Sequence, residues 1–565
     1  MSGLPEPSRR DKVFTLAGTL LGLFLAALDQ TIVATAGPVI QQDLHIEPAL
    51  YVWITTAYLV ASTVFVPIAG KLSDLYGRRW ALLAGMIVFL AGSLLCGLSR
   101  NTAMLIVFRA VQGVGSAALF TTAFAVVADL FPPAVRGKYT GLFGAVFGIS
   151  SIIGPLAGGF ITDRFGWHWT FFINLPIGAI AIAFVAARMP ALRREHAERP
   201  RIDVKGAIAL AVAVVPLLVA LTLGRGDTGD ASGFAWGSWP MLVLFATSAI
   251  GIAAFVSIER RARDPILDLR MFGNRVFSAG NSGVFVLGMA FLAAVVFLPL
   301  FMVNVVGLSA TDSGLTTTPL TLGVVVGNIV SGQLVSRFGR YKPLMLITIA
   351  LLAIAFAVMG FGLSPHASQA DVTRKMIFVG LALGPTVPLY TLAIQNGVAP
   401  QQIGAATSTA TFFRQMGSTL GITIVGAVFA STLASQLHRE LDAIAADVPA
   451  ELRSRLLVGQ GSSIGEGPSG TTLDVERVRA CITEHYAEQR AQLDDASAIA
   501  ALDREEQAAL RGVDEVADAA KAAFTTAIER IYRVCIGFAA LAFLITLRLP
   551  EIPLRRTLDG GPTPE

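Results

Sequence analysis

Long apolar stretches alternate with short polar stretches along nearly the whole chain. A bilayer core of about 30 Å is crossed by about 20 mostly apolar helical residues. Fourteen stretches reach that length, beginning near Val13, Ala49, Trp80, Thr102, Thr140, Thr170, Lys205, Trp239, Val276, Gly314, Pro343, Lys375, Ala406 and Ala527. The pattern predicts an all-α integral membrane protein with fourteen transmembrane helices. The seventh and eighth stretches fit either two crossings or one re-entrant hairpin, although each is long enough to cross alone.

The composition excludes a soluble enzyme and a disordered protein. The chain has 565 residues, of which 54% are hydrophobic and only 15% charged, whereas soluble domains are about 25% charged. The net charge of +4 gives no reason to expect a nucleic-acid partner. The three cysteines, Cys96, Cys481 and Cys535, predict neither a disulfide framework nor a metal site.

Basic residues give the orientation, because Lys and Arg are concentrated in cytoplasmic loops. With the N-terminus inside, cytoplasmic segments hold about five times as many Lys and Arg as external loops, which predicts two cytoplasmic termini and a multi-pass protein of the cell's inner (cytoplasmic) membrane. A polar insert at 432–525 then lies outside, where its ends extend the neighbouring helices and a glycine-rich break spans 459–470. This insert fits either a solvated acidic loop or a surface for a periplasmic adaptor or an envelope acceptor.

Two predicted cytoplasmic loops repeat one pattern, G-x-L-x-x-x-[YF]-G-R, beginning at Gly70 and at Gly332. We expect the glycines to allow tight turns where two helices approach, and the arginines to anchor the helix ends. Asp74 precedes the third span, where a carboxylate favours a helix N-terminus. The residues expected to act in this way are Gly70, Asp74, Gly77, Arg78, Arg79, Gly339 and Arg340. The repeat predicts two similarly oriented bundles with a transport site between them.

Charged residues inside the apolar stretches predict function, because a charge at the bilayer centre costs at least about 2.5–3.5 kcal/mol. Asp29 and Arg109 fall at similar depths in the first and fourth spans. We predict that Asp29 is the proton-coupling carboxyl group, whose protonated form is favoured by burial and opposed by Arg109. Gln112, three residues after Arg109, is predicted to act as an orienting partner of this pair or as a proton relay. The alternative is a permanent structural ion pair.

Arg414 is the third intramembrane charge, for which a gating or packing role is favoured over substrate contact. Other polar residues in the spans are candidates for a substrate cavity, although helix–helix hydrogen bonding explains them as well. These candidates are Gln30, Tyr58, Asn328, Tyr390 and Gln395.

Five motifs, in order along the chain, resemble the major facilitator superfamily. The loop beginning at Gly70 resembles the signature loop of that superfamily. Four further stretches are similar to its fourteen-helix drug:proton antiporter branch, namely LDQTIV from residue 28, RAVQGVG from residue 109, GPLAGG from residue 154 and WHWTFFINLP from residue 167. An Ala34-Thr35 pair where the family commonly has Asn-Val, and the long outer insert, are departures.

The resemblance implies the major-facilitator fold, with two six-helix bundles and two extra central helices. The expected division is a bundle at 1–189, a linker with the extra helices at 190–275, a second bundle at 276–550 that contains the insert, and a tail at 551–565. It also implies an antiporter motif in the fifth span that seals this face against leakage. Pro155 removes one helical hydrogen bond there. Glycines would clear space for packing or for a hinge, namely Gly148, Gly154, Gly158 and Gly159.

The function expected from these features is drug:H⁺ antiport. A monomer in the lipid bilayer would exchange protons for small amphipathic or lipophilic compounds, without a cofactor, since no G-x-x-x-x-G-K-[ST] phosphate loop occurs for ATP. No convergent catalytic set or metal-ligand motif occurs either, so no enzyme is expected. Export of a lipid or glycolipid to the envelope is the first alternative. A non-transporting receptor or scaffold is the second, against which the buried acid argues.

Overall fold

The computed structural model describes residues 8–190, 203–225, 234–308, 318–444, 479, 483–484, 486–487, 489–490 and 496–554. Within this part, fourteen helices are long and apolar enough to cross a membrane. The predicted all-α membrane fold is therefore confirmed, as is the number of spans. The one sheet in the described part is a parallel pair of two-residue strands, β1 (Gly224–Arg225) and β2 (Phe234–Ala235).

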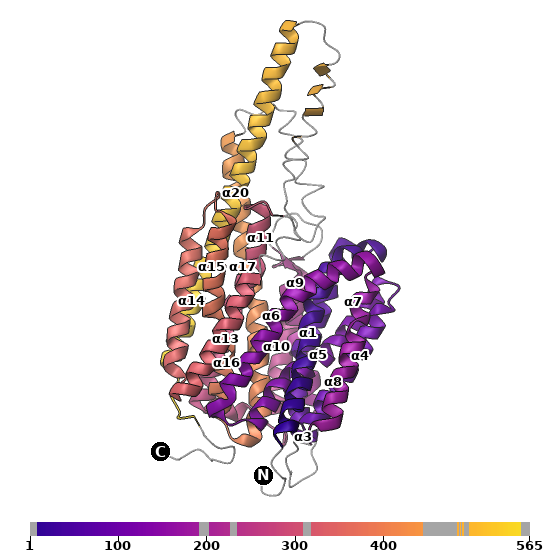
Figure 1. The fold of residues 1–565 in the computed structure, drawn as a ribbon, viewed down its shortest axis with the longest axis vertical. Coiled ribbons are helices and arrows are strands. Elements are labelled where there is room, and N and C mark those ends of the chain that lie inside the picture. Colours follow the sequence, from indigo (N-terminus) through magenta and orange to yellow (C-terminus); the bar gives the residue numbers. More distant parts are fainter. Residues whose placement is uncertain are drawn as a thin grey trace.

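The first six spans pack on one another and form the first bundle (Figure 1). Side chains at the helix starts cap exposed backbone N–H groups, as where Asn101 accepts from the N–H of Met104 at 2.9 Å. The helices are α1 (Arg9–Asp43), α2 (Pro48–Tyr51), α3 (Trp53–Tyr76), α4 (Arg78–Gly97), α5 (Thr102–Leu130), α6 (Pro133–Phe165), α7 (His168–Phe172) and α8 (Asn174–Arg188). The sixth span is made of α7 and α8 together.

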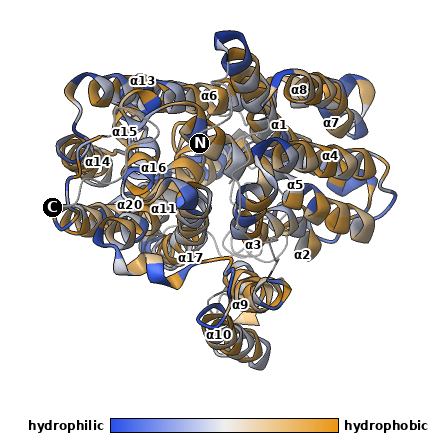
Figure 2. Ribbon diagram, turned by 90° about the horizontal axis from the view of Figure 1, so that it is seen from below, coloured by the Kyte–Doolittle hydropathy of each residue, from blue (hydrophilic) through white to orange (hydrophobic). Residues whose placement is uncertain are grey.

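The last six spans form the second bundle, beside the first (Figure 2). They are α11 (Arg275–Asn304), α13 (Thr318–Phe338), α14 (Lys342–Gly362), α15 (Gln369–Leu383) with α16 (Thr386–Asn396), α17 (Ile403–Ile444) and α20 (Ala496–Leu547). The short helices η1 (Leu269–Gly273) and η2 (Pro400–Gln402) precede α11 and α17. We call the face where α1 begins and α20 ends the base face, and the opposite face the insert face (Figure 1).

The two extra helices form an antiparallel hairpin at the margin of the molecule (Figure 2). They are α9 (Val204–Leu223) and α10 (Trp239–Glu259), each of full spanning length. Residues of α9 share an apolar cluster with Val64 of α3 and Met416 of α17. The hairpin is thus central in the sequence but peripheral in space, where it covers one seam between the bundles.

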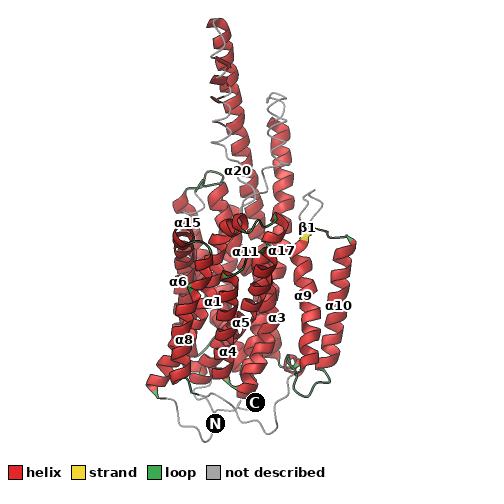
Figure 3. Cartoon of the chain, turned by 90° about the vertical axis from the view of Figure 1, so that its right-hand side faces the viewer, coloured by secondary structure: helices red, strands yellow, loops and turns green. Residues whose placement is uncertain are grey.

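Two helices extend far beyond the membrane on the insert face. At 1.5 Å per residue, the 42 residues of α17 and the 52 of α20 make helices about 63 Å and 78 Å long. Figure 3 shows α20 rising well above the other helices. The helical extensions expected at the ends of the insert are present, while the glycine-rich break at 459–470 lies outside the described residues.

Candidate functional site

A buried polar cluster in the first bundle joins α1, α3, α5 and α8. Arg109 forms an ion pair with Asp29, with 2.6 Å between Nη1 and Oδ2. The other carboxylate oxygen, Oδ1, accepts hydrogen bonds from Gln112 Nε2 at 2.7 Å and from Asn174 Nδ2 at 3.2 Å. Arg109 also donates to Gln112 Oε1 at 2.7 Å. We call Asp29, Arg109, Gln112, Asn174 and Tyr58 the acid cluster.

The acid cluster is sealed inside its bundle. Asp29 is 0% exposed and Arg109 is 1% exposed. The guanidinium lies 4.4 Å from the centre of the Tyr58 ring, a cation–π distance, and Arg109 Nε donates to the carbonyl of Ile54 at 3.1 Å. The side chains of Asp29 and Arg109 are thus enclosed in a packed cluster, in which the carboxyl group is bound by three donors.

A second network joins the two bundles at the base face. Arg78 is 2% exposed and binds Asp74 at 2.6 Å and Asp129 at 2.8 Å. The remaining oxygen of Asp74 accepts from the backbone N–H of Ala405 at 2.8 Å, in the first turn of α17. We call Asp74, Arg78, Asp129 and the Ala405 N–H the base latch.

The base latch corrects one expectation about Asp74. The sequence placed this carboxylate before the third span, as a group favouring the N-terminus of that helix. In the structure Asp74 lies in the last turn of α3 and caps α17 of the other bundle instead. The hydropathy pattern locates each helix end but says nothing about which end of a distant helix lies beside it.

A second contact between the bundles lies beside the base latch. Arg136 of α6 is 2% exposed and donates to Gln395 Oε1 of α16 at 3.1 Å. Gln395 Nε2 in turn donates to Thr407 Oγ1 of α17 at 2.9 Å. Both bundles are therefore tied together by hydrogen bonds at the base face.

Glycines make the bundle interface close at this face. The first glycine of each repeated loop touches the other bundle, since Gly70 of α3 abuts Ser408 of α17 and Gly332 of α13 abuts Gly137 of α6. The second glycine of each loop makes the turn, with φ of 94° at Gly77 and 69° at Gly339. Both values lie in the region that favours glycine. The motif glycines thus allow close helix approach and tight turns, as expected.

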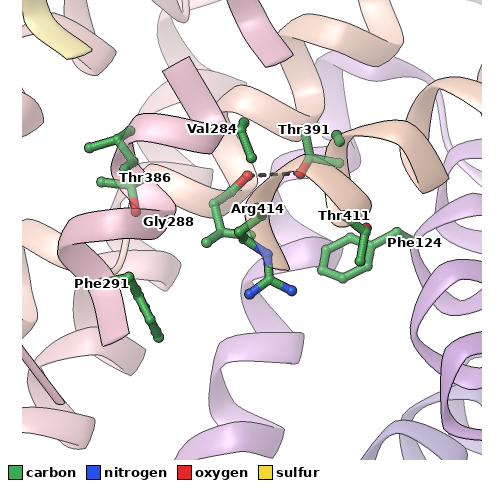
Figure 4. A pocket seen from close by; sticks show the side chains of 11 residues that line it. Phe124, Val284, Gly288, Phe291, Thr386, Thr391, Thr411 and Arg414 are labelled. Atoms are coloured by element: carbon green, nitrogen blue, oxygen red, sulfur yellow. Dashed lines mark hydrogen bonds between the residues drawn. The ribbon is translucent and has the colours of Figure 1, made fainter. Parts of the chain in front are cut away.

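A pocket lies between the bundles, next to these contacts (Figure 4). Phe124 comes from α5 of the first bundle, and the other lining residues come from α11, α16 and α17 of the second. They are Val284, Leu287, Gly288, Phe291, Thr386, Val387, Thr391, Ala410, Thr411 and Arg414. We call this the central pocket. Thr411 stands one helical turn after Thr407, which contacts Gln395.

Comparison with known proteins identifies the family. The model of the Major Facilitator Superfamily matches residues 19–422. The chain belongs to the major facilitator superfamily. It is thus a membrane transporter and not an enzyme, in agreement with both expectations.

Similar transporters are found among bacterial drug-resistance proteins. The chain is 38% identical to "Multidrug transporter protein MdtP" of Bacillus subtilis (strain 168), over 80% of this chain and 81% of that protein. It is 40% identical to "Multidrug resistance protein 3" of the same organism, over 75% and 81%. The solved human organic anion transporter MFSD10 has a TM-score of 0.57 over 74% of this chain and 94% of that one. At 17% identity, this last likeness shows the fold alone.

The structure brings some predicted site residues of the transporter together and separates others. Asp29, Arg109 and Gln112 meet as expected, and Tyr58 joins them, away from the central pocket. Gln30 is exposed on α1. Tyr390 bonds Thr546 of α20, and Asn328 packs against Gly144 of α6.

None of the five predicted cavity residues lines the central pocket, whereas Arg414 does. Arg79 donates to the carbonyl of Ala186 on α8 at 2.5 Å, which anchors the start of α4 as expected. Arg340 is exposed.

The glycines expected in the antiporter motif divide between two neighbours of α6. Gly148 faces Val325 of α13, while Gly154 and Gly158 face Thr31 and Ile32 of α1. Gly159 has no atom within 4 Å of its added Cβ position, and α6 continues through Pro155 without a break. The helix therefore touches the other bundle near the base face and α1 farther up.

Sequence reasoning missed three residues of these sites. Asn174 lies inside the WHWTFFINLP stretch, so its motif was a signal. Asp129 ends an apolar run. It lies 51 residues from Arg78 in sequence, so no sequence pattern indicated that the two side chains pair. Arg136 was visible only as one basic residue of a loop, whereas it is buried and contacts Gln395.

We predict that Gly332→Ala lowers transport about 5- to 10-fold, the size of a coupling of 1 kcal/mol or slightly more. A Cβ at this position would lie 2.7 Å from the Gly137 carbonyl carbon, so α6 and α13 must separate at the base face. Uptake and release of a fluorescent dye by reconstituted protein measures the effect. Gly426→Ala, with open space around its Cβ, is the control. Equal rates in the two variants would show that the close approach is dispensable.

Proposed function

We propose that the protein exports amphipathic or lipophilic compounds in exchange for protons, as a monomer that exposes its central pocket alternately to the two sides of the membrane. Two similar proteins are named for multidrug transport and resistance, and a third is named "Tetracenomycin C resistance and export protein". We place both termini, and hence the base face, in the cytoplasm of the cell, as the distribution of basic residues favours.

One observation carries this proposal. The bundles are joined at the base face by the base latch and by the Arg136–Gln395 contact, and the central pocket lies between the same bundles. Breaking a small number of hydrogen bonds at that face would let the bundles rock and expose the pocket to the other side. Each such contact contributes only about 0.5–3 kcal/mol net, because water replaces it when the face opens.

Asp29 is the carboxyl group we propose for proton coupling. In the described conformation its carboxyl group is bound by one guanidinium and two amides. We propose that proton exchange takes place in a second conformation, in which these donors have moved away. The packing supplies a connection, since Thr31 of α1 donates to the Ser150 carbonyl of α6 at 3.0 Å, and α6 also packs on α13 of the other bundle. Rocking of the bundles thus acts on the helix that carries Asp29.

Reconstituted full-length protein tests the proposal. An inward proton movement supplies about 2.3 kcal/mol per 100 mV, in addition to the pH term. We expect dye to accumulate against its own gradient only when a pH gradient is imposed, and each dye molecule to move with protons in the opposite direction. Equal dye movement with and without the gradient would refute proton coupling. Dye movement absent under both conditions would refute export of such compounds.

A lipid or glycolipid exporter is the second candidate, favoured by the extension of α17 and α20 beyond the membrane. The projecting helices would guide cargo to an adaptor or an acceptor in the envelope. Deletion of residues 459–470 distinguishes the candidates. Loss of lipid transfer with unchanged dye export supports the second candidate, and unchanged transfer of both argues against it.

A further inference from the structure

Arg414, which is half-buried, differs from the buried arginines of the spans. Arg78, Arg109 and Arg136 each bind a carboxylate, an amide or backbone carbonyls. No side-chain hydrogen bond or ion pair joins Arg414 to any residue that the structure describes. A guanidinium inside a membrane protein needs a compensating partner or a water-filled cavity. The central pocket, whose cavity volume is about 20 Å³ in this conformation, provides no counter-charge, because Arg414 is its single charged lining residue.

The backbone of Arg414 is held in place by close packing of α17 on α11. Gly288 of α11 leaves room for the Arg414 carbonyl, which an added Cβ would approach to 2.5 Å. Ser418 Oγ, one turn farther along α17, donates to the Gly288 carbonyl at 3.1 Å. Packing therefore fixes the backbone position from which the Arg414 side chain extends. This position lies about 16 Å along α17 from Ile403.

The remaining polar groups of the central pocket cannot replace Arg414 as donors. The hydroxyl groups of its three threonines already donate within their own helices, Thr386 to Leu383 at 2.6 Å, Thr391 to Val387 at 2.8 Å and Thr411 to Thr407 at 3.0 Å. Figure 4 shows the Arg414 guanidinium extending away from Thr386 and Thr391. The hydrogen-bond donors that the lining side chains offer a ligand thus come from this one cation.

The rest of the lining is suited to an apolar body. Phe124, Phe291, Val284 and Leu287 surround the pocket with aromatic and aliphatic carbon. Aromatic and aliphatic walls with one placed polar group are the usual composition of a small-molecule site. Arginine binds a carboxylate through two parallel hydrogen bonds, which gives both affinity and orientation.

We propose that Arg414 binds the anionic group of an amphipathic organic substrate, such as a carboxylate, whose apolar body lies against Phe124 and Phe291 once separation of the bundles enlarges the central pocket. This inference deepens the proposed function, on which it rests, by naming a substrate class. It also differs from the gating or packing role that the sequence favoured for Arg414. Because Thr411 of the pocket is one turn from Thr407 at the bundle contact, the bound anion lies next to the groups that separate when the bundles rock.

Three probes with one apolar body test the charge preference. They are 4-(1-pyrenyl)butanoate, the uncharged 4-(1-pyrenyl)butanol and the cationic 4-(1-pyrenyl)butyl-trimethylammonium. Binding to detergent-solubilised full-length protein is measured by fluorescence, independently of transport. We expect Arg414→Gln to weaken binding of the butanoate at least about tenfold, the effect of losing a charged hydrogen bond, and to leave binding of the butanol within twofold. Arg414→Lys is expected to lose less than Arg414→Gln, since it keeps the charge but not the fork of donors.

The outcomes separate this inference from the export proposal. Arg374→Gln, at an exposed arginine of α15, is the matched control, and the melting temperature reports on folding. Equal weakening of all three probes by Arg414→Gln would overturn the inference and indicate packing or gating. An equally strong binding of the cation by wild type would also overturn it. Butanoate binding that depends on Arg414, without export of any probe from proteoliposomes, would support the site and refute the export proposal.

Discussion

Asp29→Asn is expected to lower export driven by a pH gradient by about a hundredfold or more, the usual effect of removing an essential proton-transfer group. The variant is also expected to be less stable than wild type. Arg109 is 1% exposed and has its 2.6 Å ion pair with this carboxylate, so the substitution leaves a buried cation without its counter-charge. Removing one partner of a buried pair costs about 3–5 kcal/mol. Loss of export by this variant alone therefore does not distinguish removal of the proton-carrying group from a loss of folded protein.

The double variant Asp29→Asn/Arg109→Gln separates the two effects. It removes both charges, so the melting temperature of the purified protein should recover most of the loss seen in Asp29→Asn. Export driven by the pH gradient should stay at the background level, because no titratable carboxyl group remains in the acid cluster. Asp163→Asn, at an exposed carboxylate of α6, controls for the substitution itself.

Two results would overturn the assignment of Asp29. Wild-type export by Asp29→Asn would show that this carboxyl group does not carry the proton. Recovery of both stability and pH-driven export by the double variant would show that the ion pair is structural, which is the alternative that the sequence left open. Release of protons on substrate binding, measured with a pH-sensitive dye in weakly buffered detergent solution, gives a further check on the same point.

The sequence predicted that Asp29, Arg109 and Gln112 lie together, because depth along a helix is nearly fixed by counting residues. At 1.5 Å per residue, Asp29 and Arg109 come out at similar levels of the bilayer, and Gln112 follows on the same face of its helix. The rotation of each helix about its axis is set by packing. That is why Tyr58 was expected in a substrate cavity, although it lies against Arg109.

Contacts between the bundles were harder to predict than contacts within one. The repeated glycines indicated close approach, and Gly70 and Gly332 do make it, but nothing in the loop identified Ser408 and Gly137 as their neighbours. The same limit applies to Gln395, which was expected to line a cavity and contacts Arg136 across 259 residues of sequence. Hydropathy defines which segments cross the membrane, whereas the pairing of α3 with α17 and of α6 with α13 depends on the shapes of the packed surfaces.

Asp74→Asn is expected to shift the protein toward conformations in which the bundles separate at the base face. The carboxylate binds the Ala405 N–H at 2.8 Å and Arg78 at 2.6 Å. Its negative charge also lies at the N-terminus of α17, where anions are favoured. The contact with α17 exists only while the base face is closed, so its loss destabilises that state selectively. A charged hydrogen bond contributes about 1.5–3 kcal/mol, which corresponds to roughly a 10- to 150-fold change in the equilibrium between conformations.

Spin labels at Tyr76 and Gln401 measure this shift, because both side chains are exposed and lie at the facing ends of α3 and η2. In a Cys481→Ser background, the short distance between the labels should dominate in wild type and a longer one in Asp74→Asn, with transport slowed at least fivefold. Asp371→Asn is the matched control, since Asp371 forms an i,i+4 pair with Lys375 at the start of α15, within one bundle. If Asp74→Asn and Asp371→Asn give the same distances as wild type, the base latch does not hold the bundles closed. In that case the Arg136–Gln395 contact and the close packing of glycines would hold the bundles closed at the base face.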